Sequence, residues 1–70
     1  MAHSEGDRVK WDWGDGTGTG KVTKVYHQKT TVRIKGTEVT RDASRACPAY
    51  LIEQQDGDDV LKSESEVSAV

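Results

Sequence analysis

The aromatic side chains have the clearest binding chemistry in this chain, because their rings can hold a cation or stack on a base. There are four of them, Trp11, Trp13, Tyr26 and Tyr50, and no phenylalanine. Tryptophan and tyrosine faces attract alkylated ammonium groups, as in the aromatic cages that bind methylated lysine. A chain of 70 residues also needs large apolar groups for its core, and rings serve that purpose too. We expect Trp13 and Tyr26 to be the rings that reach the surface.

Basic residues are concentrated in the earlier part of the chain. Nine of the ten Lys and Arg residues lie between residues 8 and 45, whereas residues 46–70 carry six acidic residues and one lysine, and the formal net charge is -2. The candidate ligand-binding cations are Lys10, Lys21, Lys24, Arg33 and Lys35, with Arg8 and Lys29 as further phosphate contacts. In a small fold the basic and acidic parts interleave in space, so a mixed solvated surface accounts for many of these charges.

A glycine-rich run covers residues 14–20 and precedes Lys21, which gives it a superficial likeness to a phosphate-binding loop. Asp15 stands where the first glycine of such a loop belongs, Val22 replaces the required Ser or Thr, and no helical pattern follows. The run therefore predicts no nucleotide site.

No other group of residues has the spacing of a catalytic or metal-binding site. His3 lies in an N-terminal tail, His27 lies in a polar connection, and neither is near Cys47 in sequence. The acidic residues Asp56, Asp58 and Asp59 fall in a segment too short for a calcium-binding loop and are explained by a hairpin turn. We therefore expect no enzymatic activity, no metal and no cofactor.

The sequence predicts that short β-strands position these side chains. Residues 8–13 alternate polar and apolar side chains, which is the period of a half-buried strand. The glycine run 14–20 predicts a loop that continues into a glycine-bearing strand and lets a neighbouring strand approach closely. Residues 21–26 continue as a strand, but Val22 and Val25 fall on opposite parity, which predicts a bulge between them.

The second half of the chain shows the same kind of pattern. Extended segments are expected at residues 30–35, 49–54 and 59–62, with 37–41 as a short strand or an extended arm. Asp56-Gly57 between two extended segments is a strong hairpin indicator. Val67 could add a last short strand.

Several short strands without a helix of useful length predict an all-β fold, a small SH3-like barrel of about five mostly antiparallel strands. A five-stranded OB barrel is the alternative, although it usually has a longer chain and a helix between its third and fourth strands. The expected domain covers residues 6–68, with residues 1–5 and 69–70 as flexible ends. The expected core consists of Val9, Trp11, Val22, Val32, Ile34, Tyr50, Ile52 and Val60.

The motifs Gly6-Asp-x-Val-x-Trp11, Gly20-x-Val22, Ala43-Ser44 and Pro48-x-Tyr50-x-Ile52, with Lys62 and Ser65, occur in this order. In these motifs the chain resembles the hypervirulence-associated Tudor-like domain family over residues 6–67. The resemblance implies a Tudor-type barrel in a short stand-alone protein, and it implies no ligand. The chain departs from the family pattern at residues 45–47, where acidic or Asn residues are more usual.

Three kinds of partner remain open from the sequence. A binding or adaptor module for a protein or peptide is the first hypothesis, with an extended or proline-rich peptide lying beside Trp13 and a 14–18 loop. Nucleic acid, bound through the basic strands and an exposed ring, is the alternative, although the sequence pI of about 5.6 argues against it. A methyl-lysine cage is the third.

A soluble, monomeric, cytoplasmic protein is the expected setting. The single Cys47 allows no internal disulfide, which is typical of a reducing compartment. The N-terminus lacks the basic and apolar regions of a signal peptide, and no apolar run is long enough for a membrane span.

Overall fold

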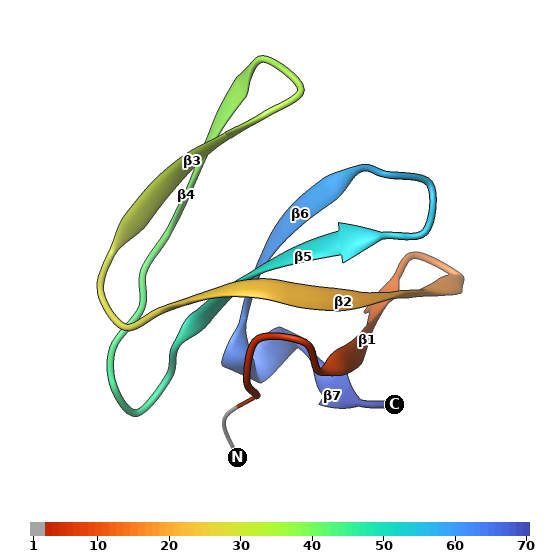
Figure 1. Ribbon diagram of the computed structural model, residues 1–70, viewed down its shortest axis with the longest axis horizontal. Coiled ribbons are helices and arrows are strands. Elements are labelled where there is room, and N and C mark those ends of the chain that lie inside the picture. Colours follow the sequence, from red (N-terminus) through yellow and green to blue (C-terminus); the bar gives the residue numbers. More distant parts are fainter. Residues whose placement is uncertain (1–2) are drawn as a thin grey trace.

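The computed structural model describes residues 3–70, with Trp13 described by its backbone alone. This part of the chain forms β-strands and one short 3₁₀ turn (Figure 1). The elements are β1 (Arg8–Trp13), β2 (Gly16–Tyr26), β3 (Thr30–Ile34), β4 (Thr37–Arg41), β5 (Ala49–Gln54), β6 (Asp59–Ser63), η1 (Glu64–Glu66) and β7 (Ser68–Ala69). Five strands form one antiparallel sheet in the order β6-β5-β2-β1-β7, and β3 and β4 form a separate two-stranded sheet. The all-β, Tudor-type SH3-like architecture is therefore confirmed.

A two-residue turn joins β1 to β2, which is shorter than the loop expected from the glycine run. Trp13 pairs with Gly16, so only Gly14 and Asp15 lie between the strands. Gly14 has a φ of +51°, which favours glycine because other residues are strained there. The remaining glycines of the run belong to β2, and this fixes which residues of β1 and β2 face each other.

The bulge expected between Val22 and Val25 is confirmed. The register of β2 against β5 shifts between Val22 and Lys24, so Thr23 is the extra residue. The hydroxyl of Thr23 donates a hydrogen bond to the carbonyl of Leu51 at 3.0 Å. As a consequence Lys21 and Lys24, which are three residues apart, pair with residues two apart on β5 and lie on the same face of the sheet.

The core lies on the opposite face of the five-stranded sheet. Its buried cluster consists of Val9, Trp11, Val22, Tyr50, Ile52 and Val67, with Val25 and Val60 packed against it. Pro48, Ala49 and Leu61 are also buried, although the sequence had not placed them in the core. Val32 and Ile34, which were expected there, are only half-buried and belong to β3 in the separate hairpin. The prediction that Val32 and Ile34 belong to the core is therefore wrong. The alternating pattern correctly placed both side chains on one face of the strand, but other parts of the chain cover that face only in part.

The β5–β6 hairpin forms at the Asp56-Gly57 sequence, as expected. Its turn is closed by a hydrogen bond from the amide of Gly57 to the carbonyl of Gln54 at 3.0 Å, and Gly57 has a φ of +89°. The connection between β5 and β6 is therefore longer than a two-residue turn, and Gly57 occupies the left-handed position at its end.

Both ends of the described chain contact the sheet. Ser68 and Ala69 pair with β1 as the short strand β7, so the last strand suggested at Val67 exists but begins one residue later. The backbone amide of His3 donates a hydrogen bond to the hydroxyl of Tyr50 at 2.9 Å. The domain bounds of 6–68 stay a prediction, and these contacts lie just outside them.

Candidate binding surface

Four basic side chains gather on the outer face of β1 and β2, away from the core. Arg8 pairs with Lys21 across the two strands, and Lys10 pairs with Thr19. The bulge at Thr23 places Lys24 on this face as well. All four cations are exposed. We call this surface the basic face, and it is made of Arg8, Lys10, Lys21 and Lys24.

None of the four cations of the basic face forms an ion pair among residues 3–70. The ion pairs of the described chain involve His3, Lys35, Arg41 and Lys62 as the positive groups. Glu53 lies opposite Lys21 in β5, but it forms no ion pair with it. Like charges that stand directly opposite each other across two strands are destabilising. Arg8 and Lys21 therefore form a like-charged pair without an ion pair among residues 3–70, and an anion could stabilise it.

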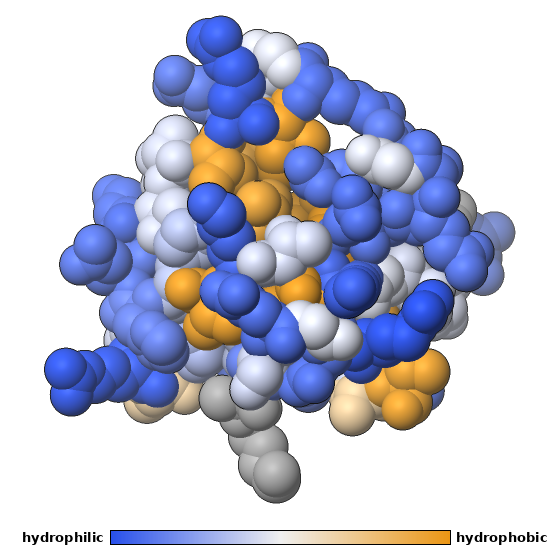
Figure 2. Space-filling view, in the orientation of Figure 1, coloured by the Kyte–Doolittle hydropathy of each residue, from blue (hydrophilic) through white to orange (hydrophobic). Residues whose placement is uncertain are grey.

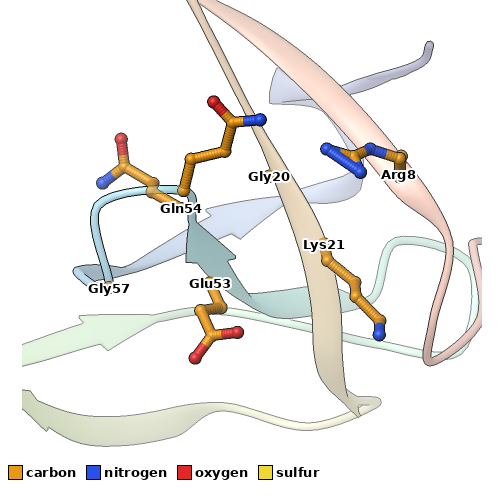
Figure 3. A pocket seen from close by; sticks show the side chains of 7 residues that line it. Arg8, Gly20, Lys21, Glu53, Gln54 and Gly57 are labelled. Atoms are coloured by element: carbon orange, nitrogen blue, oxygen red, sulfur yellow. The ribbon is translucent and has the colours of Figure 1, made fainter.

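An open groove of about 330 Å³ adjoins this pair (Figure 3). It is lined by Arg8, Gly20, Lys21, Glu53, Gln54, Gln55 and Gly57. In Figure 3 the guanidinium of Arg8 points toward β2, whereas Lys21 extends from β2 away from Glu53 of β5. The groove thus combines two cations, one carboxylate and two carboxamides, which suits polar contacts with a peptide better than burial of an apolar molecule.

The structure brings together only some of the cations predicted from the sequence. Lys10, Lys21 and Lys24 lie on the basic face, whereas Arg33 lies in β3 and Lys35 in the turn after it. Arg8 was missing from the principal candidates, because only the register of β1 against β2 shows that it faces Lys21. Glu53, Gln54 and Gln55 were also missed, since nothing in their sequence marks them as neighbours of Arg8.

The aromatic residues divide between core and surface. Trp11 is 5% exposed and Tyr50 is fully buried, so both belong to the core. Tyr26 is half-buried at the end of β2. The side chain of Trp13 lies outside the described residues, so the cage hypothesis is untested for that ring. Gly16 and Gly18 belong to β2 rather than to a loop, which corrects the expected loop rim at residues 14–18.

A polar cluster closes one end of the core around Tyr50. Its hydroxyl donates to the carboxylate of Glu64, with both oxygens at 3.2 Å, and accepts a hydrogen bond from the amide of His3. The ring of His3 packs edge-on against Tyr50 at 5.4 Å, and its Nε2 lies 3.6 Å from Glu64 Oε1. Burial, with the nearby Glu64 carboxylate adding to it, raises the pKa of Tyr50 above its usual value of 10.0. This cluster attaches the N-terminal segment and has no accessible reactive group.

The remaining features add no catalytic constellation. Within the described part of the chain, no three His, Cys, Asp or Glu side chains gather as metal ligands would. Cys47 is a free, half-buried thiol. Residues 3–70 contain no helix with the length and apolarity needed to cross a bilayer.

Comparison with known proteins identifies the family. The model of the hypervirulence associated proteins TUDOR domain matches residues 6–67. The chain therefore belongs to this family, as its motifs suggested. No curated protein and no solved structure shows a significant match. Small domains of the Tudor type are typically binding modules rather than enzymes, and the family supports a binding role in general.

Proposed function

We propose that this Tudor-domain family member is a non-enzymatic binding module whose partner is an acidic segment of another protein. The observation that carries the proposal is the pairing of Arg8 with Lys21 on the outer face of the sheet, without an ion pair to either side chain among residues 3–70. A domain of this size has little stability to spare. A like-charged cross-strand pair is a cost that an acidic partner would remove on binding.

The groove beside the pair supports a peptide as the partner. Gln54 and Gln55 line it together with the cations, and carboxamides can donate to and accept from a peptide backbone. The guanidinium of Arg8 can bind a carboxylate through two parallel hydrogen bonds. An Asp or Glu side chain of an extended segment is therefore the group that fits this site.

The charge around the basic face favours protein over nucleic acid. Asp12 and Glu53 project from the same face of the sheet as the cations, so the cations do not form the continuous basic stripe that a phosphate backbone needs. The pI of about 5.6 is also far from the strongly basic values typical of nucleic-acid-binding domains. A cytoplasmic location is part of the proposal, since the single cysteine is a free thiol of the kind that reducing compartments preserve.

The test is affinity capture from native lysate with the immobilised chain, with and without nuclease. We expect a protein partner that survives nuclease treatment and is lost with the double variant Arg8→Glu/Lys21→Glu. Arg45→Glu is the matched control, because it reverses an exposed charge outside the basic face. Release of the captured material by nuclease, or equal capture by the double variant, would show the proposal to be wrong.

A further inference from the structure

The β3–β4 hairpin stands apart from the five-stranded sheet. Neither of its strands pairs with any other strand among residues 3–70. Figure 1 shows the hairpin projecting from the rest of the fold. A two-stranded hairpin in water is only marginally stable, and a third strand or a covering layer is what normally stabilises it. The hairpin therefore has an edge that can accept another strand.

The register shows which backbone groups this edge offers. Ile34 and Thr37 flank the two-residue turn, so they exchange hydrogen bonds with each other. Because such pairs alternate along an antiparallel ladder, Arg33 and Thr31 direct their N–H and C=O groups away from β4. These two residues are the docking positions of the β3 edge. Their counterparts on the β4 edge are Glu38 and Thr40.

The β4 edge is the less accessible of the two. Arg41 at the end of β4 donates from Nε to the carbonyl of Leu61 in β6 at 3.3 Å. Both hairpin strands also contact β6. Figure 2 shows apolar surface in the hollow between the hairpin and the β5–β6 region. On the face that Val32, Ile34 and Val39 share, all three are half-buried. The hairpin thus contacts β6 through both strands, but among residues 3–70 only β4 carries a hydrogen bond to β6, so β3 is the more open edge.

We propose that the β3 edge binds an extended segment of an acidic protein partner, which adds to the hairpin as a third strand. Four of the five residues of β3 are β-branched, and the strand contains no proline, which is one of the devices that protect natural edges. Lys29 and Arg33 are exposed and make no ion pair within residues 3–70. A strand with acidic side chains on its outer face complements them.

A second copy of this chain fits the edge less well. Two copies joined through β3 would bring together two sets of Lys29, Arg33 and Lys35, and like charges across a strand pair are unfavourable. Charged side chains on an edge strand are a common means of preventing self-association. The same cations that attract an acidic strand therefore oppose a homodimer. Alternate apolar residues in the partner strand would extend the layer formed by Val32 and Ile34.

The probe is a synthetic peptide of about ten residues in which Glu alternates with Val. Nuclear magnetic resonance should show amide shifts at Thr31 and Arg33 and slower hydrogen exchange of their N–H groups. Thr31→Pro removes an outward N–H without removing a bond between β3 and β4, and it should weaken the peptide's affinity at least about tenfold. A peptide with Lys in place of Glu should not bind.

Thr40→Pro is the matched control. Thr40 pairs with Thr31, the two hydroxyls lie 2.7 Å apart, and Thr40 directs its N–H to the other edge of the hairpin. Both proline variants lose the same hydroxyl contact and strain the same hairpin, so only edge-specific binding separates them. Equal affinities for the two variants would overturn the proposal, and so would a loss confined to Thr40→Pro.

Two further outcomes would assign the edge to another occupant. A concentration-dependent dimer in sedimentation that Thr31→Pro abolishes would identify a second copy, and displacement of the peptide by a single-stranded oligonucleotide at the Thr31 and Arg33 amides would identify nucleic acid. Either result overturns the proposal. The variant Arg8→Glu/Lys21→Glu should leave peptide binding at β3 unchanged. Failure at this edge is thereby separated from failure of the basic face.

Discussion

The indole of Trp11 occupies the space that a side chain at Gly18 would need. The two residues are partners across β1 and β2, and a Cβ placed on Gly18 would lie 2.6 Å from Cε2 of Trp11 and 2.7 Å from its Nε1. Gly18 is not among the glycines with positive φ. Glycine is therefore required here by packing rather than by the backbone conformation.

Gly18→Ala should lower the free energy of unfolding by about 1–3 kcal/mol, because the added methyl group overpacks the site and must displace a buried ring. Urea denaturation followed by tryptophan fluorescence measures the loss. Thr19→Ala is the control, since Thr19 is the next residue of β2 and its side chain is exposed. Equal midpoints for the two variants would contradict the role assigned to Gly18.

The sequence predicted the strands and the bulge well because these depend on local patterns. The opposite parity of Val22 and Val25 is sufficient to require an extra residue between them. Whether the apolar face of a strand is buried depends on parts of the chain that are distant in sequence. The alternation of polar and apolar residues carries no information about those parts. Val32 and Ile34 therefore look like core residues in sequence, although their hairpin forms a separate sheet.

The candidate site was only partly predictable for the same reason. Lys10 and Lys21 could be placed on outward positions from the period of their strands. The pairing of Arg8 with Lys21 depends on register, and the register follows from a turn made of Gly14 and Asp15 alone. In a run of alternating glycines, several turn positions are equally compatible with the sequence.

Arg8→Glu should separate stability from binding. The substitution replaces a like-charged pair with an opposite-charged one opposite Lys21, so the free energy of unfolding should rise by about 0.2–1 kcal/mol at low salt. Capture of the protein partner should fall at the same time. Thermal unfolding and the capture assay, run side by side with Arg45→Glu, measure the two effects. A variant that loses stability and binding together would indicate a structural role for Arg8 instead.

Tyr50→Phe should change how stability depends on pH. Because burial raises the pKa of Tyr50 above 10.0, the folded chain holds the phenolic proton more tightly than the unfolded chain does. The contribution of this proton is complete below about pH 10 and is lost as pH rises toward the folded-state pKa. Removing the hydroxyl should therefore reduce the loss of stability in alkali.

At neutral pH the same substitution should cost about 1–3 kcal/mol, since the Glu64 carboxylate and the His3 amide each lose a hydrogen-bond partner. Urea denaturation across neutral and alkaline pH measures both effects. Tyr26→Phe makes the same chemical change at a half-buried ring and serves as the control. An alkaline limb as steep in Tyr50→Phe as in the unmodified chain would mean that another group causes it.

Lys35→Asn should stabilise the hairpin at high salt and less so at low salt. Lys35 has a φ of +52° in the two-residue turn between β3 and β4, where Asn followed by Gly is strongly preferred. Lys35 instead forms an ion pair, with Nζ at 2.6 Å from Asp58 Oδ2. Because the Lys35 side chain is largely exposed and the Asp58 side chain is partly exposed, salt screens the pair and leaves the backbone preference to decide.

Asp58→Asn isolates the ion pair in this comparison. The hydrogen bond and charge of Asp58 raise the pKa of Lys35 above 10.5, so the pair contributes below that pH and its contribution disappears as pH rises through the raised pKa. We therefore expect Asp58→Asn to lower the melting temperature at neutral pH and low salt, with a difference that shrinks both in high salt and in strong alkali. If Lys35→Asn melts below the unmodified chain even at high salt, the turn is not strained at Lys35.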